Sequence, residues 1–319
     1  MKDRVEQKNE MISTTIKHYK ILEKLGEGGM GVVYKADDTK LKRTVALKFL
    51  SAELTFDEKA KQRFVQEAQA ASALDHPNIC TIHEIDETDT GQMFIVMTYY
   101  EGKSLQEIVG AQNSVPLPLD DAINYAMQIA EGLARTHEAG IMHRDMKPAN
   151  IMVTDRGEVK IVDFGLAKLA GHIGPTDIGN SLGTVAYLSP EQSEFEKTDK
   201  RADIWALGVI LYEMLTGQKP FQGEADQVVL YSIVNEEPTA ISELRPEVPE
   251  KLQLVVKKAL AKDPDERYQY VDEMLGDLQR LKSDSNESRR TRKRNHRLYA
   301  IIAAILISPM MHRLSPRRA

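Results

Sequence analysis

The spacing of apolar and polar residues changes once along the chain, near residue 102. Before that point, short runs rich in Val, Ile, Leu and Tyr are bounded by Gly, Asp or Lys, which is typical of hairpin strands. We predict strands over residues 19–25, 31–36, 44–50, 80–85 and 93–99. A helix is predicted among them over residues 57–74. Phe64, Ala68 and Ala71 recur on one face of that helix.

After residue 102 the pattern is mostly helical. Asp120 is a suitable N-cap for a helix that ends near Glu138. Residues 202–215 are apolar nearly all round, which indicates a buried helix. Further helices are predicted over residues 225–235, 249–260 and 271–281. Strands with one helix, followed by a helical block, predict an α+β fold with two lobes, about residues 18–101 and 102–282.

The two ends of the chain differ from this central unit. Residues 1–17 are polar and charged, so we predict a flexible N-terminal tail without the apolar run of a secretory signal. Residues 283–297 form a polar linker that ends densely basic, and residues 315–319 form a basic tail. Between them, residues 298–314 contain an apolar run of 14 residues, shorter than the ~20 that a membrane-spanning helix needs.

Composition excludes some classes of protein. Of the 319 residues, 42% are hydrophobic and 28% charged, which argues against global disorder. The net charge of -6 gives no general case for nucleic-acid binding. The single cysteine, Cys80, cannot form an intramolecular disulfide, which favours a reducing compartment. We expect Cys80 to be a small buried hydrophobic residue.

A glycine-rich segment, GEGGMGVV, lies between two predicted strands. Its glycines Gly26, Gly28 and Gly31 would let backbone N–H groups approach phosphates closely. The same pattern marks dinucleotide-binding folds, but there a helix follows the glycines, and here a strand does. A simple glycine-rich turn remains the alternative for this segment alone.

Lys48 lies on the predicted strand 44–50 and is a candidate cation that would bind nucleotide phosphates. Glu67 on the predicted helix is the candidate anion that would hold this lysine in place. An isolated Lys–Glu pair is usually a surface ion pair without a functional role. The functional interpretation of this pair therefore depends on the other motifs.

Two further motifs are HRDMKPAN and IVDFGLA. In the first, Asp145 could accept a proton from a hydroxyl, Lys147 could neutralise a phosphoryl group, and Asn150 offers an oxygen suited to magnesium. In the second, Asp163 supplies a carboxylate that would complete an oxygen site. If each motif is considered alone, the first could be a charged hairpin loop and the second an Asp-containing turn.

Together, and in this order, these motifs resemble the eukaryotic-type serine/threonine protein kinase family, most of all its bacterial receptor-type members. The resemblance covers about residues 19–281. It implies a two-lobed protein kinase domain over residues 18–282, with a small, mainly β N-lobe and a larger, mainly α C-lobe. It also implies transfer of the γ-phosphoryl group of ATP, with Mg²⁺ or Mn²⁺, to Ser or Thr hydroxyls of protein substrates.

The resemblance also implies roles for individual residues. Lys48 would pair with Glu67, and Asp145 would be the catalytic base with Lys147 beside it. Asn150 and Asp163 would hold the metal ion. Met97 resembles the gatekeeper behind adenine. The residues implied to contact the nucleotide are Gly26, Glu27, Gly28, Gly29, Met30, Gly31, Val33, Ala46, Lys48, Met97, Thr98 and Tyr100.

Control of the site is implied by a second group of residues. In the family, the arginine at the position of Arg144 binds a phosphorylated residue of the activation loop. We hypothesise autophosphorylation at Thr176 or Ser181, through self-association of two chains; the alternative is that these are exposed hydroxyls. Thr184 resembles the threonine that contacts the base and its lysine.

Three residues are implied to be structural anchors. Glu191 would pair with Arg267, and Asp203 would brace the loop that begins at His143. The segment Ser189-Pro190-Glu191 replaces the Ala-Pro-Glu that is usual in the family.

The basic and then apolar C-terminal end resembles the juxtamembrane and anchor region of bacterial receptor-type kinases. It predicts a cytoplasmic kinase domain attached to the inner face of the membrane through residues 298–314. Truncation of the chain, a segment lying at the membrane surface, and a disordered or packed tail remain alternatives.

Three other functions are alternatives to a kinase. A catalytically inactive, nucleotide-binding pseudokinase or scaffold predicts loss of Lys48, Asp145, Asn150 or Asp163, and all four are present. A Rossmann-type oxidoreductase predicts alternating strands and helices, which the chain lacks. A structural membrane adaptor would need only the C-terminal segment, and the kinase-like motifs would then have no function.

Overall fold

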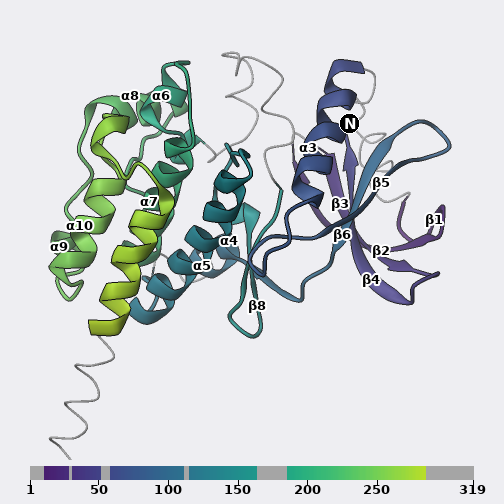
Figure 1. The fold of residues 1–319 in the computed structure, drawn as a ribbon, viewed down its shortest axis with the longest axis horizontal. Helices are drawn as coiled ribbons and strands as arrows, with labels where there is room; N and C mark the ends of the chain where they lie inside the picture. Colours follow the sequence, from purple (N-terminus) through teal and green to yellow (C-terminus); the bar gives the residue numbers. More distant parts are fainter. Residues whose placement is uncertain (1–10, 29–30, 52–57, 111–114, 164–184, 285–319) are drawn as a thin grey trace, which may run out of the picture.

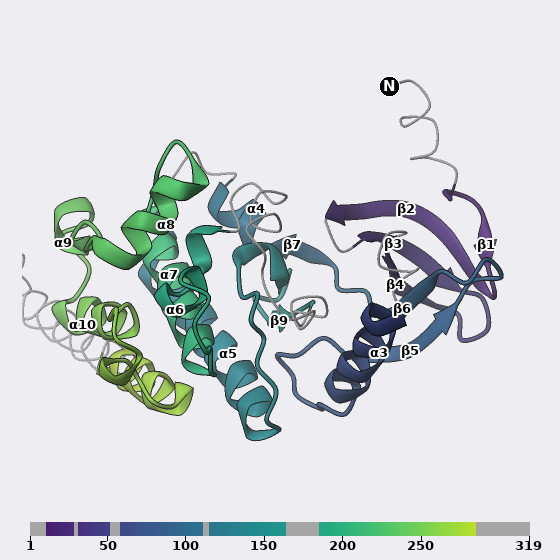
Figure 2. The same ribbon diagram turned by 90° about the horizontal axis from the view of Figure 1, so that it is seen from above.

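The computed structural model describes residues 11–28, 31–51, 58–110, 115–163 and 185–284. Figure 1 shows the strands β1–β6 with helix α3 at one end of the molecule and the helices α5–α10 at the other, and Figure 2 shows the same division from above. The two-lobed α+β architecture predicted from the sequence is confirmed.

The N-lobe is built on a six-stranded sheet with the order β1-β2-β3-β4-β6-β5 and antiparallel neighbours. Its strands are β1 Thr15–Ile16, β2 Tyr19–Gly28, β3 Gly31–Asp38, β4 Arg43–Leu50, β5 Ile82–Glu87 and β6 Met93–Thr98. One face buries an aromatic core in which Phe49 lies 5.8 Å from Tyr34 and 5.3 Å from Phe94, between ring centroids. Strand β5 begins later than predicted, at Ile82.

Part of the predicted flexible tail belongs to this sheet. Strand β1 pairs with β2, and the Ser13 backbone N–H donates to the Ile21 carbonyl at 3.0 Å. Met11 packs against the apolar core. Residues 13–16 of the predicted tail are thus hydrogen-bonded to the sheet through their backbone groups. Residues 1–10 lie outside the described residues.

Helix α3, Glu58–Ser72, covers the sheet near β5. Its apolar stripe buries Phe64 and Ala68 against Leu50 and Ile95. The helical period read from the sequence thus identified the buried face of this helix.

The C-lobe is a helical layer around α7, Arg201–Thr216. This helix is buried on nearly all sides because it packs against both α5 and α10. The other helices are α4 Leu105–Gly110, α5 Leu119–Glu138, α6 Pro190–Ser193, α8 Asp226–Asn235, α9 Ile241–Leu244, α10 Glu250–Ala259, and residues 271–284. Helix α5 has Pro118 at its N-cap and begins at Leu119, so the prediction of Asp120 as N-cap is wrong; that aspartate lies in the first turn, where it favours the helix dipole.

A three-stranded sheet joins the two parts: β7 Gly102–Ser104, β8 Ile151–Thr154 and β9 Val159–Ile161. The Cys80 backbone N–H donates to the Ile161 carbonyl at 2.9 Å, which ties β9 to the segment before β5. The Val162 N–H donates to the Asn150 carbonyl at 2.9 Å. The residues that follow β9 are thereby held beside the end of the HRDMKPAN segment.

Close packing of α7 against α10 depends on Gly208. A Cβ atom at this position would lie 2.8 Å from the Ala259 Cβ and 3.1 Å from a Leu260 methyl. We therefore expect Gly208→Ala to lower the free energy of unfolding by about 1–3 kcal/mol in urea titrations. Gly276→Ala is the matched control. It lies in helix 271–284 with nothing within 4 Å of the added methyl, and should raise stability by up to ~1 kcal/mol. Equal effects would contradict this packing.

Residues 285–319 lie outside the described part of the chain, so the predicted linker and apolar segment have no structural account. Among the described helices, none has both the length and the apolar character needed to cross a bilayer.

Candidate active site

The loop that carries HRDMKPAN is held from below by the first turn of α7. The carboxylate of Asp203 accepts the backbone N–H groups of His143 and Arg144, both at 2.9 Å. Asp203 is buried, and burial would raise its pKa. Its bonds to His137 and to the loop outweigh burial, so the pKa lies below the ordinary value and the group is an anion.

The backbone of Arg144 is strained. Its φ is +62°, a left-handed conformation that non-glycine residues adopt at a cost of about 1–2 kcal/mol. Both of its peptide groups are held: Asp203 accepts the N–H, and the Gln192 side-chain amide donates to the carbonyl at 3.3 Å. The loop is therefore fixed by contacts to α6 and α7, and its own sequence does not favour this shape.

Three side chains of the loop meet at one carboxylate oxygen. The Lys147 ammonium lies 2.9 Å from Oδ2 of Asp145, and the Asn150 amide donates to the same oxygen at 3.2 Å. Asn150 also donates to the Asp145 backbone carbonyl at 2.8 Å. Asp145 and Asn150 are both buried. The sequence-predicted base, cation and metal ligand are thus brought into contact.

Asp163 and Lys48 come to this site from the other side. Oδ1 of Asp163 lies 2.9 Å from the Lys48 ammonium, which is itself buried in the N-lobe sheet. Asp163 has a φ of +57°, a second left-handed residue at the site. The side chain of Glu67, predicted to pair with Lys48, lies outside the described residues. The described partner of this lysine is instead the carboxylate predicted to bind metal.

Asn150 and Asp163 suit a hard divalent cation. Asn150 uses its amide nitrogen on Asp145, so its amide oxygen is the atom left to ligate. Asp163 adds carboxylate oxygen, and the Asn150–Val162 backbone bond holds the two residues close. Among the described residues, no cluster of three His, Cys, Asp or Glu side chains forms a self-sufficient cage. Mg²⁺ prefers a few protein oxygens as ligands, with phosphate oxygens completing its coordination shell.

An apolar cluster adjoins Lys48. It contains Ala46 and Met97, which are directly paired on β4 and β6, and Cys80 behind them. Burial raises the pKa of the Cys80 thiol to about 12, so it is a neutral hydrophobic residue, as predicted. The remaining members, all partly buried, are Val33, Tyr99, Tyr100 and Val162. Such a surface suits a flat aromatic group.

In the glycine-rich segment, Gly31 is required by packing. Its φ is +139°, and a Cβ there would lie 1.8 Å from the Phe49 carbonyl oxygen. Gly26 and Gly28 are different, because nothing lies within 4 Å of an added Cβ. Packing among the described residues therefore does not explain their lack of a side chain. Gly29 and Met30 lie outside the described residues, and Glu27 is exposed at the end of β2.

Glu191 and Arg267 form a buried bidentate pair. The two guanidinium nitrogens donate to the two carboxylate oxygens, each at 2.8 Å, and both side chains are buried. This pair fixes α6 to the loop that precedes helix 271–284.

This pair predicts a pH dependence of stability. Burial would raise the pKa of Glu191, but the hydrogen bonds and charge of Arg267 outweigh burial and hold the pKa below its usual 4.5. The unfolded chain therefore binds the proton first as the pH falls. We expect the stabilisation to be complete above about pH 4.5 and to be lost below it.

The measurement is the free energy of unfolding in urea from about pH 7 to about pH 3. The double variant Glu191→Gln with Arg267→Met, which leaves no lone buried charge, should show a shallower decline. An equal decline would assign the acid sensitivity to other groups.

Two residues at the site were not predicted from the sequence. Gln192, which holds Arg144, also forms a capping box with Ser189, and the pattern S-x-x-Q was a signal for it. The second residue is His137, whose Nε2 lies 2.8 Å from Oδ2 of Asp203. Thr176, Ser181 and Thr184 lie outside the described residues.

Comparison with known proteins defines the class. Residues 19–277 match the family model of the protein kinase domain, and the chain belongs to this family. Its relatives include the serine/threonine-protein kinase PrkC of Bacillus subtilis, 40% identical over 82% of this chain and 40% of PrkC. Another is the serine/threonine-protein kinase PknB of Mycolicibacterium smegmatis, 42% identical over 82% of this chain and 43% of PknB. The chain thus spans less than half the length of these curated relatives.

Solved structures agree with this assignment. The crystal structure of the Mycobacterium tuberculosis PknI kinase domain matches with a TM-score of 0.66 and 26% identity, covering 84% of this chain and 98% of that one. The fold is therefore the two-lobed protein kinase fold.

Proposed function

We propose that this chain is an ATP-dependent kinase that phosphorylates Ser and Thr hydroxyls of proteins. The observation that carries the proposal is the contact of Asp145 with Lys147 and Asn150, beside the Lys48–Asp163 pair. Each group has a separate use in phosphoryl transfer. The names of the bacterial relatives support the choice of Ser and Thr.

Asp145 is the group that accepts the proton of the attacking hydroxyl. Lys147 and Asn150 both contact its Oδ2 and hold the carboxylate in place beside the Lys48–Asp163 pair. Lys147 is placed to balance negative charge that develops on the transferred phosphoryl group. Mg²⁺, with Mn²⁺ as a substitute, would be held by Asn150 and Asp163 and would neutralise phosphate charge when bound.

The nucleotide is assigned to the apolar cluster and the glycine loop. Adenine would lie against Ala46, Val33 and the gatekeeper Met97, and bond to backbone groups of Thr98 and Tyr100. The unfilled space at Gly26 and Gly28 leaves room for phosphates to approach the backbone. The other glycine-loop residues proposed to contact ATP are Glu27, Gly29, Met30 and Gly31. Lys48 binds the α- and β-phosphates, with Glu67 as its second partner.

Activity is proposed to depend on the activation segment. Arg144 would bind a phosphate on Thr176 or Ser181, added by a second copy of the chain, and Thr184 would contact Asp145 and Lys147. Mass spectrometry of active enzyme tests the phosphorylation; neither residue modified would contradict it. A cytoplasmic domain attached to the inner membrane face through residues 298–314 rests on sequence alone. Equal fractionation with and without residues 298–319 would contradict it.

The direct test is transfer of labelled γ-phosphate to a generic basic protein in the presence of Mg²⁺. We expect label on Ser and Thr, none on Tyr, and no transfer after EDTA removes the metal. The catalytically inactive alternative predicts no transfer with Mg²⁺ or Mn²⁺. It has no support at present, because Lys48, Asp145, Asn150 and Asp163 are all retained and brought together.

A further inference from the structure

The outer edge of strand β9 is bonded by side-chain amides as well as by backbone groups. In the described sheet, with the order β7-β8-β9, this strand is the last one. The Ile161 backbone N–H donates to the Asn78 carbonyl at 2.8 Å, and its carbonyl accepts from the Cys80 N–H at 2.9 Å. At Val159 two side chains take over this role. Its N–H donates to Oε1 of Gln128 at 2.8 Å, and its carbonyl accepts from the Asn78 amide at 2.9 Å. The edge is thus held at both of its ends.

Gln128, on α5, bonds three parts of the chain at once. Besides the Val159 N–H, its Oε1 accepts from the Asn78 amide at 3.1 Å, and its Nε2 donates to the Gly157 carbonyl at 3.0 Å. These partners lie on β9, on the segment between α3 and β5, and on the turn that precedes β9. Val159 is fully buried and Asn78 is 5% exposed. Water therefore has little access to replace the acceptor that Gln128 supplies.

Helix α5 lies directly against this edge. Gly132 follows Gln128 by one turn, so both residues are on the same face of the helix. A Cβ atom at Gly132 would lie 2.7 Å from a methyl carbon of Ile161 and 3.3 Å from the Asn78 carbonyl oxygen. The missing side chain at Gly132 lets the helix approach, and the amide of Gln128 is the polar contact made at this approach.

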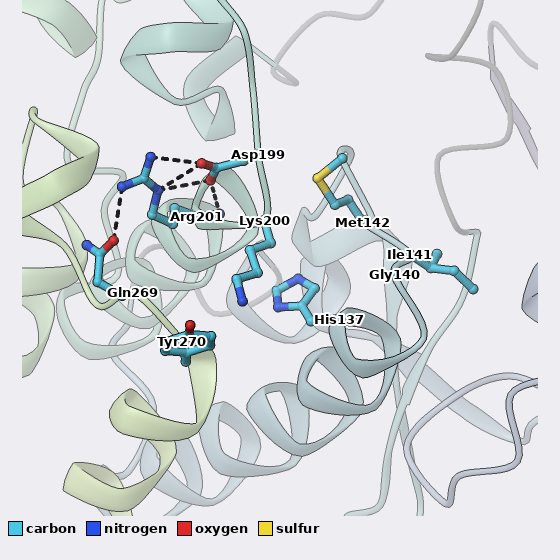
Figure 3. Close-up of a pocket in the computed structure, with 9 residues that line it drawn as sticks. All are labelled: His137, Gly140, Ile141, Met142, Asp199, Lys200, Arg201, Gln269 and Tyr270. Carbon is cyan, nitrogen blue, oxygen red and sulfur yellow. Dashed lines mark hydrogen bonds and ion pairs between the residues drawn. The ribbon is translucent and has the colours of Figure 1, made fainter.

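The other end of α5 makes a polar contact to the catalytic loop. There His137 bonds the carboxylate of Asp203, which holds the start of that loop. Figure 3 draws His137 at the end of the helix together with Ile141 and Met142, which lead into the loop. Helix α5 therefore contacts both elements of the site, the loop that carries Asp145 through His137 and strand β9 through Gln128.

We propose that Gln128 is a positioning residue for the metal ligand Asp163. This aspartate follows β9 by two residues. Strand β8 holds β9 from the inner side, where the Val162 N–H also donates to the Asn150 carbonyl. Gln128 holds β9 from the outer side and so keeps Asp163 and Asn150 at a separation at which one ion can bind both. The inference rests on the proposed function, because it takes these two residues as the metal ligands.

The first measurement is hydrogen exchange of the full chain without metal or nucleotide. Gln128→Met keeps the length of the side chain and removes all three bonds. We expect the Ile161 amide to exchange about tenfold faster than in the wild type, with the amides of β4 unchanged. Gln253→Met is the matched control. Gln253 is also partly buried and bonds one backbone carbonyl, that of Val248 at 2.9 Å, on α10. It should leave the exchange of Ile161 unchanged.

The second measurement is the gain in nucleotide affinity that a metal ion brings. The Kd of a non-hydrolysable ATP analogue is measured by calorimetry with and without Mn²⁺. Gln128→Met should reduce the gain about tenfold and leave the Kd without metal unchanged, whereas Gln253→Met should match the wild type. A merely structural role would lower stability without changing this gain. No turnover is needed, so a wild type that shows the gain but transfers no phosphate would contradict the kinase function and not this proposal.

A second variant at the same position separates the acceptor from the donor. In Gln128→Glu the carboxylate still accepts from Val159 and Asn78 but no longer supplies the amide N–H to Gly157, which lies in a partly exposed turn. It should stay within about threefold of the wild type in both measurements. If Gln128→Met shows no cooperative unfolding in urea, Asn78→Asp replaces it, because a carboxylate cannot donate to the Val159 carbonyl. The proposal is overturned if the metal-dependent gain is unchanged in the folded variant, or if Gln128→Glu loses as much as Gln128→Met.

Discussion

Asp145→Asn is expected to reduce kcat for transfer to protein by about 10²–10⁴-fold while leaving the fold and ATP affinity close to wild type. An amide cannot take the proton of the attacking hydroxyl. The substitution keeps the shape of the side chain, and an amide oxygen at the Oδ2 position still accepts from Lys147 and Asn150. The loss should therefore appear in kcat, with little change in thermal stability.

Asp155→Asn is the matched control. It makes the same chemical change on an exposed residue of the turn between β8 and β9, and kcat should stay within about twofold of wild type. The assays are initial rates of γ-phosphate transfer and calorimetric binding of ATP. If Asp145→Asn retained more than about a tenth of the wild-type kcat, Asp145 would not be the base.

The sequence predicted the type of most elements because the period of apolar residues follows the buried faces. Helix α3 is an example, since Phe64 and Ala68 face the sheet as expected. The errors are local. Pro118 rather than Asp120 is the N-cap of α5, and residues 13–16 join the sheet through backbone bonds that no side-chain pattern reports.

The candidate site was predicted in its composition but not in its geometry. The motifs pointed to Asp145, Asn150 and Asp163 as candidate site residues. They did not predict the left-handed backbone conformation of Arg144 and Asp163. At Arg144 that conformation is held by Asp203 and Gln192, which are distant in sequence. The contact between Lys48 and Asp163 also depends on how β9 is tied to the rest of the chain, which requires the folded structure.

Asp203→Asn is expected to impair catalysis, although Asp203 is not one of the groups that react. Both carboxylate oxygens accept from donors: Oδ1 from Arg144, and Oδ2 from His143 and His137. An asparagine presents one oxygen and one NH₂, so in either orientation a donor faces a donor. A buried donor left without an acceptor costs about 1–3 kcal/mol, and this loss should appear as a lower free energy of unfolding in urea.

The same substitution releases the backbone of Arg144 and so displaces Asp145 next to it. Because small displacements of reacting groups cost large factors in rate, we expect kcat to fall about 10²-fold at a temperature where the variant remains folded, with the KM for ATP nearly unchanged. Asp265→Asn is the matched control: its side chain is 84% exposed and pairs with Arg201, so it should cost less than about 1 kcal/mol and leave kcat intact. A folded Asp203→Asn enzyme with wild-type kcat would show that the loop keeps its shape without this carboxylate. The left-handed Arg144 would then be held mainly by Gln192, whose amide bonds the Arg144 carbonyl from α6.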